Sequence, residues 1–348
     1  MMSKTKELNV PMSPKYMLIY LSAISRVRHI ALLLLLPFIA FCESDFKKDK
    51  HHILSVVSEN DFYFEDFIRS DKYYTAGHYL SYTSKELDDS FLNKIKLFSY
   101  FSRHSFARLN VSLSQEIYTP ANKSATKPSS DDMLYGAAVI VSFSSINRTK
   151  NFMEQLGIDM GLAGPLALGE QIQNSVHKLT DKNPSRGWDT QIKNEFLLNL
   201  HYGMIYSVKL IDNVADILPQ GQIFLGNAYT AISAGARLRI GYGIKNDFGI
   251  QKYKSKMSQV MVDNGLKIYA LAGVNGSLVG RDIFIEGNTF KGVKSHLNLE
   301  RTLYEYELGV AIGYKNISLS YLFTRGSKKF KEQDEFHSYG SLRLDMSF

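Results

Sequence analysis

The stretch Tyr304–Phe323, YEYELGVAIGYKNISLSYLF, decides the fold class. As far as Tyr314, a large apolar side chain stands at every second position, between acidic or small residues. The same alternation resumes at Ile317, directly after the pair Lys315-Asn316. A period of two places successive side chains on opposite faces of a β-strand. The pattern therefore predicts two antiparallel strands joined by a tight turn, with one apolar face and one small or polar face.

The same period recurs far from this hairpin, at Leu109–Ser114 and at Ala236–Gly243. The second segment places Arg237 and Arg239 on one face, which suits the polar lumen of a barrel whose other face meets lipid. The chain ends on a third alternating segment, Leu342–Phe348, with an aromatic last residue, and this resembles the closing strand of bacterial outer-membrane barrels. These segments favour a membrane barrel over the alternative, a soluble β-sandwich.

Half-polar spans of this length cannot be transmembrane helices, which need about 18 or more consecutive apolar residues. A closed barrel satisfies every backbone N–H and C=O group without an open edge, as hydrocarbon requires. We therefore predict an all-β fold for residues 43–348, an antiparallel transmembrane barrel of about twelve strands in the bacterial outer membrane. Several long outer loops are expected among the irregular segments 84–104, 119–136, 164–192, 212–230, 253–265 and 325–336.

The N-terminus has the pattern of a secretory signal peptide. A basic flank ending at Arg28-His29 precedes the short apolar run Ile30–Phe41, and small residues at Ala40 and Cys42 predict cleavage near Cys42–Glu43. Residues 1–42 are thus expected to be a signal peptide, because the apolar run is too short for a membrane anchor. A lipoprotein site at Cys42 is the alternative, and the bulky Phe41 disfavours it.

Composition excludes several kinds of chemistry. The whole chain has 41 basic and 34 acidic residues, but residues 1–42 hold five of the basic and one of the acidic ones. The remainder has 36 basic and 33 acidic residues, a net charge of +3, which gives no case for nucleic-acid binding. Cys42 is the one cysteine, so the mature chain has neither disulfides nor a thiol nucleophile.

Two short segments carry polar side chains that a plain scaffold does not require. Asn60 and Asp61 offer adjacent hard oxygen ligands of the kind that Ca²⁺ prefers, although a turn or a solvated strand end would look the same. Thr75 shares a face of its expected strand with Tyr73 and Gly77, so it can point into the lumen near the barrel mouth. Ordinary strand propensity is the alternative explanation for this threonine.

A short helix is predicted over residues 166–179, between Gly164-Pro165 and Asn183-Pro184. Gln173 and His177 lie one turn apart on it and share a face. Histidine is the side chain best suited to act as a general base near neutral pH, although a lone histidine is also often structural. The sequence contains no G-x-S-x-G, H-E-x-x-H or phosphate-loop motif, so serine hydrolysis by those arrangements is unsupported.

An ordered series of segments resembles the outer-membrane lipid A 3′-O-deacylase family. Each segment is short, but together they follow the family's order along most of the mature chain. They are Asn60-Asp61, Tyr73–Gly77, Gln115–Pro120, Leu162–Pro165, Gly169–Asn174 with His177-Lys178, and Trp188 with Gln191–Glu195.

The resemblance implies a twelve-stranded barrel that hydrolyses an ester bond and removes the 3′-linked acyloxyacyl chain of lipid A in lipopolysaccharide. It implies a Ca²⁺ requirement, with Asn60 and Asp61 as metal ligands, and a site among lumen-facing residues near the outer rim. Thr75 belongs to that site by resemblance, with Gln173 and His177 on a covering helix. His177 would take a proton from the water that attacks the ester carbonyl, and Ca²⁺ would stabilise the oxyanion.

Two positions depart from the family's pattern. A glutamate is expected six residues after the histidine, where this chain has Asn183, and Asp181 is the alternative group to orient the imidazole. The family's lysine after the Tyr-Thr-Pro turn corresponds to Lys123 or Lys127, of which we favour Lys123. The rival functions are a non-enzymatic pore or structural barrel, and an outer-membrane phospholipase, which would need a serine–histidine pair.

Overall fold

The chain divides into two units, Met1–Glu43 and Ser44–Phe348, and the expected signal peptide, residues 1–42, lies outside the described residues. The computed structural model describes residues 48–61, 72–87, 106–179, 181, 183–244, 247–260, 265–290 and 292–348.

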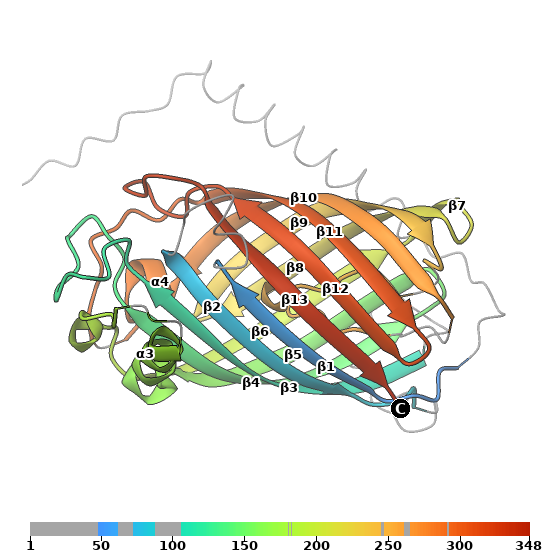
Figure 1. Cartoon of the computed structure of the whole chain (residues 1–348), viewed down its shortest axis with the longest axis horizontal. Coiled ribbons are helices and arrows are strands. Elements are labelled where there is room, and N and C mark those ends of the chain that lie inside the picture. Colours follow the sequence, from blue (N-terminus) through green and yellow to red (C-terminus); the bar gives the residue numbers. More distant parts are fainter. Residues whose placement is uncertain are drawn as a thin grey trace, which may run out of the picture. The chain divides into compact units, whose positions relative to one another are not determined.

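The second unit consists mainly of antiparallel strands (Figure 1). They are β1 (Ile53–Asn60), β2 (Tyr73–Thr83), β3 (Phe106–Thr119), β4 (Gly136–Arg148), β5 (Phe152–Ala163), β6 (Glu195–Tyr206), β7 (Val208–Ile211), β8 (Ala215–Gly226), β9 (Tyr229–Tyr242), β10 (Lys267–Asp282), β11 (Thr302–Tyr314), β12 (Ile317–Gly326) and β13 (His337–Ser347).

Twelve of these strands close into a barrel, as predicted. Each pairs with its neighbours in sequence, and the first and last meet because Ile53 of β1 lies opposite Ser347 of β13. The ring also closes between β6 and β8, where Asn199 lies opposite Gly226. The short β7 pairs with β8 beyond the end of β6 and adds a hairpin to one rim. The closing-strand prediction for the C-terminus is therefore confirmed.

The two faces of the wall follow the predicted alternation. In the hairpin β11–β12, Tyr314 pairs with Ile317 around the turn, and outward Leu308 is 59% exposed whereas its neighbour Glu307 is 1% exposed. Arg237 and Arg239 of β9 are buried on the lumen side, as expected of a polar lumen. Arg237 forms an ion pair with Glu307, and Arg239 forms ion pairs with Asp216 and Asp247.

The barrel has two unlike rims. We call the rim where β1 ends and β2 begins the helix rim, and the opposite one, where β13 ends, the terminal rim (Figure 1). Of the expected outer loops, 119–136, 164–192 and 325–336 lie at the helix rim. The described parts of segments 84–104 and 253–265 instead follow β2 and β9, which end at the terminal rim.

The expectation that residues 212–230 are irregular is wrong, because most of that segment is β8. The strand contains Pro219, although proline cannot donate a ladder hydrogen bond. Its position explains why the strand tolerates it. The pairing of β8 with β6 ends at Gln220, and the pairing with β7 begins at Ile217. Pro219 thus lies where β8 changes partners on that side.

The described part of the β9–β10 connection, residues 247–260, folds back into the lumen, and we call it the plug. Lumen-facing arginines fix its backbone: Arg237 donates to the Ile250 carbonyl at 2.7 Å and Arg343 to the Gln251 carbonyl at 2.9 Å. On the opposite wall, Gln155 donates to the Lys256 carbonyl at 2.7 Å. The plug therefore fills much of the barrel's cross-section from the terminal rim.

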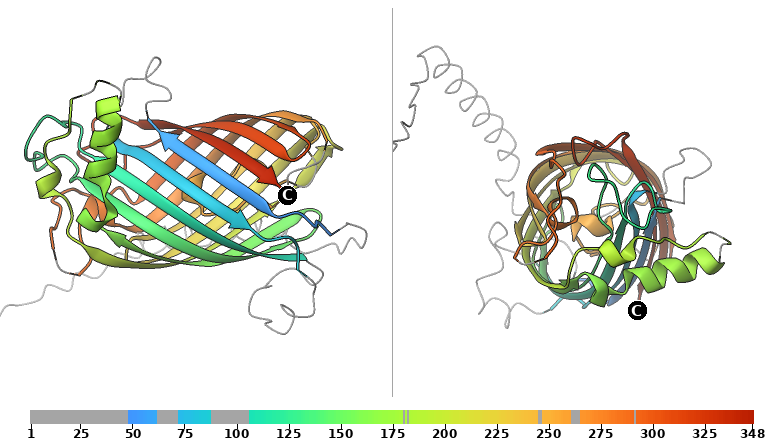
Figure 2. Two further views of the ribbon diagram at one scale, coloured as in Figure 1. Left: turned by 60° about the horizontal axis from the view of Figure 1, so that its bottom comes forward. Right: turned by 90° about the vertical axis from the view of Figure 1, so that its left-hand side faces the viewer.

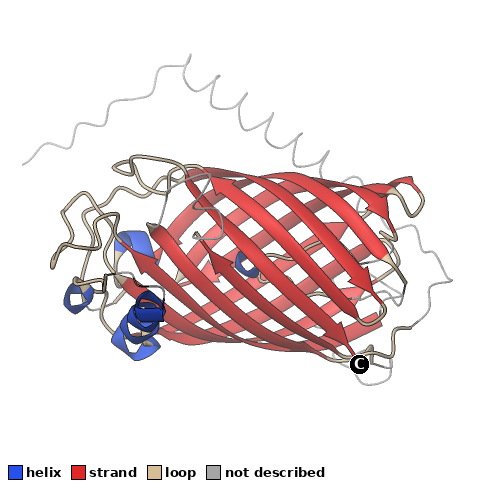
Figure 3. Ribbon diagram, in the orientation of Figure 1, coloured by secondary structure: helices blue, strands red, loops and turns tan. Residues whose placement is uncertain are grey.

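Short helices complete the fold (Figure 3). None in the described part of the chain is long and apolar enough to cross a membrane. The predicted helix appears as α3 (Gly169–Leu179), after the turn η3 (Pro165–Ala167), and the other short helices are η4 (Trp188–Thr190), η5 (Tyr253–Ser255) in the plug and α4 (Ile283–Glu286).

Candidate active site

The helix α3 lies on the outside of the barrel wall at the helix rim (Figure 2). Ala138 of β4 lines the lumen cavity, so its neighbour Ala137 faces outward. A Cβ on Gly169 would lie 2.5 Å from the Ala137 Cβ and 2.7 Å from the Trp188 ring. Glycine at the start of α3 therefore allows the helix to rest directly on the wall. The expected covering helix thus covers the lipid-facing side.

Gln173 lies on the buried face of α3. Its Oε1 accepts a hydrogen bond from the indole Nε1 of Trp188 at 3.0 Å. With its oxygen used in this way, the amide nitrogen Nε2 has no hydrogen-bond partner within the described residues. Trp188 in turn packs on Tyr135 with ring centroids 4.9 Å apart. This arrangement presents the amide N–H₂ group of Gln173 as a fixed donor.

His177 lies one turn further along α3 and is 7% exposed. Its Nδ1 is 2.8 Å from the main-chain carbonyl oxygen of Asn183. A carbonyl can only accept, so Nδ1 carries a proton, and whenever the ring is neutral its lone pair is on Nε2. That is the tautomer a general base requires. The orienting group is thus a backbone carbonyl of Asn183, in place of the glutamate or of Asp181.

Thr75 is placed differently from the sequence prediction. A β-bulge between Tyr74 and Ala76 interrupts the alternation of β2. Tyr74 reaches the lumen, where its hydroxyl donates to Glu59 at 2.8 Å. The Thr75 hydroxyl instead lies 2.7 Å from that of Thr119. The strict period placed Thr75 on the lumen face and Tyr74 opposite, and the extra bulge residue makes that assignment wrong.

Asn60 and Asp61 lie at the helix-rim end of β1. Asn60 is opposite Ala76 of β2, and Ala76 packs in one outward cluster with Ile117 and Trp188. The side chain of Asp61 is 2% exposed. The described residues contain no group of three or more carboxylate, histidine or cysteine side chains that could hold a metal ion. The amide and buried carboxylate are nevertheless hard oxygen donors, and they fit Ca²⁺ as a partial ligand set completed by carbonyls or water.

The inner side of the wall supports the ends of these two strands. Glu59, next to Asn60, accepts hydrogen bonds from Tyr74, from Ser341 at 2.8 Å and from the plug backbone at Tyr253 at 3.1 Å. The ammonium group of Lys254, also in the plug, lies 3.5 Å from the centre of the Tyr74 ring. The plug thus braces the lumen face of the wall that carries Asn60 and Thr75.

Of the two candidate lysines, Lys123 is hydrogen-bonded to residues next to α3 and η4, whereas the described residues show no such bond for Lys127. The Lys123 carbonyl accepts from the Tyr135 hydroxyl and from the Arg186 backbone, both at 3.2 Å. Lys123 is half-buried, whereas Lys127 is exposed. This placement favours Lys123. All six candidates therefore lie at the helix rim, on β1, β2, α3 and the β3–β4 loop.

A family model described as "Outer membrane protein LpxR" matches residues 29–348. The chain belongs to this family. The resemblance noted from the sequence is thereby confirmed, and with it the outer-membrane location. None of the curated proteins matches the chain in a direct sequence comparison.

The fold agrees with a solved member of the LpxR family. "LpxR from Salmonella typhimurium" superimposes with a TM-score of 0.69 at 21% identity, over 85% of this chain and all of that one. Other barrels are much less similar. The alignment with the β domain of the Bordetella autotransporter BrkA covers 86% of this chain and 99% of that chain, with 9% identity and a TM-score of 0.42.

Sequence reasoning missed a serine–histidine–aspartate chain in the lumen of this LpxR-family barrel. The Ser144 Oγ is 3.4 Å from the His201 Nε2, and the His201 Nδ1 is 3.2 Å from Asp159. The three residues lie on adjacent strands, so no sequence motif marks them. Asp159 lines the lumen cavity but Ser144 and His201 do not, and the Ser144–His201 contact is long. The Ser144–His201–Asp159 arrangement therefore gives no support to the phospholipase alternative.

Proposed function

We propose that this protein is a lipid A 3′-O-deacylase, a carboxylic ester hydrolase that removes the 3′-linked acyloxyacyl chain of lipopolysaccharide. Membership of the LpxR family supports an enzyme acting on lipid A in the outer membrane. The observation that carries the chemistry is the oriented imidazole of His177 on a helix lying against the lipid-facing wall. An acyl chain in the outer leaflet can reach that side without entering the barrel.

In this proposal, His177 is the general base. Its Nε2 takes a proton from a water molecule, which attacks the ester carbonyl, and the Asn183 carbonyl stabilises the imidazolium that forms. The same imidazolium then returns its proton to the departing oxygen, so the deacylated sugar hydroxyl and a free carboxylic acid result. An imidazole oriented through Nδ1 by a backbone carbonyl fits this sequence of proton transfers.

The neighbouring side chains would stabilise and position the substrate. Gln173 offers its amide Nε2 to the oxyanion that develops at the ester carbonyl. Thr75, held by Thr119, offers a hydroxyl on the same outward side of β2. Lys123 supplies a cation near the helix segment for an anionic substituent of the lipopolysaccharide head group.

Asn60 and Asp61 are the residues we propose to hold Ca²⁺. When bound, the ion would supply a positive charge that polarises the ester carbonyl. The role of the protein here is to present an amide and a buried carboxylate oxygen at the edge of the wall, beside Ala76. The brace of Glu59 and Tyr74 on the lumen side keeps these strand ends in place.

The pore alternative receives less support than the enzyme. A conducting barrel needs an open lumen, and here residues 247–260 pack into it and bond to opposite walls. The candidate residues also lie at the helix rim, and α3 with Gln173 and His177 is on the outer side of the wall, where it serves no purpose in conduction.

The direct test is mass spectrometry of lipid A from cells that make this protein and from cells that do not. We expect lipid A from the producing cells to lose the mass of one acyloxyacyl group, with the loss assigned to the 3′ position. Identical lipid A in both strains, with folded protein present in the outer membrane, would contradict the proposal.

A further inference from the structure

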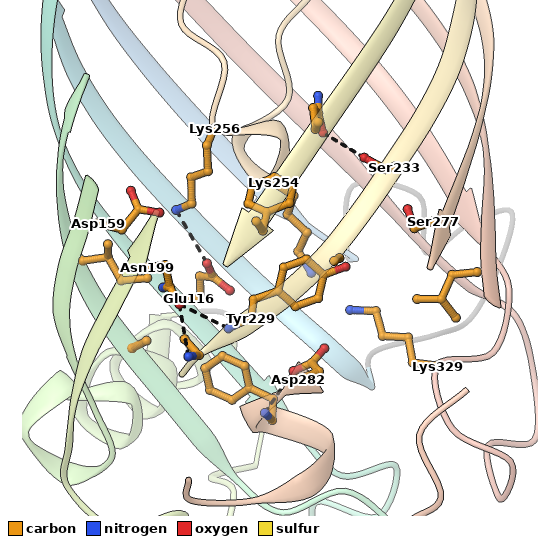
Figure 4. A pocket seen from close by; sticks show the side chains of 18 of the residues that line it. Glu116, Asp159, Asn199, Tyr229, Ser233, Lys254, Lys256, Ser277, Asp282 and Lys329 are labelled. Carbon is orange, nitrogen blue, oxygen red and sulfur yellow. Dashed lines mark hydrogen bonds and ion pairs between the residues drawn. The ribbon is translucent and has the colours of Figure 1, made fainter. Parts of the chain in front are cut away.

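The lumen holds a second polar site, separate from the residues above. A cavity of about 130 Å³ lies between the plug and the helix rim (Figure 4). A smaller cavity of about 20 Å³ adjoins it, and the two share Lys254 and Lys329 as wall residues. Lys254 comes from the plug and Lys329 from the β12–β13 loop. The strand β13 contributes His337 and Tyr339 to the smaller cavity.

The carboxylates around these cavities already have partners. Glu305 is paired with Lys252 at 2.5 Å, and Glu116 accepts from Tyr118 at 2.7 Å and lies 4.0 Å from Lys256. Asp282 accepts from the Phe284 backbone at 3.0 Å, and Asp159 lies against His201.

Two cations remain without a carboxylate. Within the described residues, neither Lys254 nor Lys329 has one within 4.0 Å, yet both face the Tyr118 ring, at 5.1 and 5.7 Å from its centre. Burial, and after it the charge of Lys329, lowers the pKa of Lys254. Two like charges in a low-dielectric site repel each other, and the charges of Glu116, Glu59 and Asp282 offset this only in part. An anion bound between the two ammonium groups would remove the rest of that cost.

Two buried polar side chains of β13, His337 and Tyr339, line the smaller cavity together with Lys254 and Lys329. His337 and Tyr339 are 5% and 3% exposed, and they share the lumen face of β13 with Ser341 and Arg343. The Tyr74 backbone lies near the His337 ring and the Thr324 hydroxyl lies near that of Tyr339, but within the described residues neither contact has the geometry of a full hydrogen bond. A buried polar group left in this way costs about 1–3 kcal/mol, and an anion in the cavity would offset that cost by accepting from both side chains.

The position of Lys329 is fixed by the fold. Its backbone N–H donates to Gln333 at 2.8 Å and its carbonyl accepts from Glu300 at 2.8 Å, so the loop cannot readily withdraw the side chain. Lys254 is fixed as well, because its ammonium group donates to the Tyr118 hydroxyl at 3.2 Å and lies on the Tyr74 ring.

We propose that Lys254, Lys329, His337 and Tyr339 form an oxyanion site inside the barrel mouth that binds a phosphoryl group. Two ammonium groups match the charge of a phosphate dianion, and four donors from three elements suit its several oxygens. A phosphoryl group could come from free phosphate or from the phosphorylated sugar of a lipid head group. The site lies in the lumen, so it is distinct from the outward-facing ester site.

The test measures binding of inorganic phosphate to the whole purified protein in detergent, by calorimetry at constant ionic strength. We expect wild-type protein to bind phosphate, and Lys329→Gln and Lys254→Gln each to bind it about 10- to 100-fold more weakly, as expected for loss of a charge-assisted hydrogen bond. Lys331→Gln is the matched control, because Lys331 is in the same loop but exposed. It should leave the affinity unchanged.

Glucosamine 6-phosphate, used as a second probe, separates the two sources of the anion. Tighter binding of the sugar phosphate than of phosphate would support the site with a head group as its ligand, whereas equal binding would support it with free phosphate. A Lys329→Arg variant keeps the charge and guards against loss of folding, and it should bind within about 10-fold of wild type. No phosphate binding by wild-type protein, or equal weakening by Lys331→Gln, would overturn the proposal.

Discussion

At the scale of single residues, Asn183 shows how the proposed base, His177, can be oriented by the backbone of a residue that lacks the expected carboxylate side chain. The main-chain carbonyl of Asn183 accepts from His177. Any residue at this position would supply the same carbonyl, whatever its side chain. The sequence identified His177 and Gln173 from their spacing on a helix. It could not identify the orienting group, because that group belongs to the backbone. Trp188 was part of one of the segments that resemble the family, but the sequence alone did not show that it hydrogen-bonds to Gln173.

The two residues of this hydrogen bond should therefore respond differently to mutation. His177→Ala is expected to lower deacylation by about 10²–10⁴-fold, the usual contribution of a positioned base. Asn183→Ala should keep activity within about 10-fold of wild type, because it leaves the carbonyl in place. Acyl release by equal amounts of folded protein is the measurement. Equal losses in the two variants would show that the Asn183 side chain matters and would count against the backbone role.

Asp61 provides a second prediction at this scale. Asp61→Asn keeps the size of the side chain but removes its charge, so Ca²⁺ binding should weaken and half-maximal activity should need at least about 10-fold more Ca²⁺. The titration compares acyl release at rising Ca²⁺ in wild-type protein and in the variant. Wild-type activity that survives excess chelator would rule out the proposed role of Asn60 and Asp61.

At the scale of elements, regular patterns were predictable and interruptions were not. The hairpin Tyr304–Phe323 and the helix α3 have clear periods of two and of about 3.6, so the sequence predicted both. The bulge at Thr75 adds one residue to β2 without a local signal, so the predicted face was wrong. The plug could not be foreseen, because its contacts come from arginines far apart in the sequence, such as Arg237 and Arg343.

The docking of α3 on the wall gives a prediction at this scale. Gly169→Val should push the helix away from Ala137 and Trp188, because even a Cβ would lie within 2.7 Å of both. Activity should fall by more than about 10-fold while the barrel remains folded, since the contact is on the outer face of β4 and leaves the pairing of the strands unchanged. Gly276→Ala is the control, because the nearest atoms to its Cβ would be 4.0 Å away. Full activity in folded Gly169→Val would show that α3 need not rest on the wall.

At the scale of the whole molecule, the plug provides a test that distinguishes an enzyme from a conducting pore. Residues 247–260 fill the lumen, so the purified protein should show little ion conductance in a planar bilayer. Replacing the central part of the plug, Gly249–Met257, with a glycine–serine linker should open channels, provided that the heat-modifiable band of the folded barrel is retained. Large, steady conductance by the wild-type protein would favour the pore.

The most direct test of the central claim uses purified protein and lipid A whose 3′ acyloxyacyl chain is intact. Tandem mass spectrometry of the products identifies both the released chain and the position from which it came. The account predicts loss of the acyloxyacyl group from the 3′ position by the wild-type protein, and almost none by an equal amount of folded His177→Ala. Release from another position, or equal release by the two proteins, would contradict it.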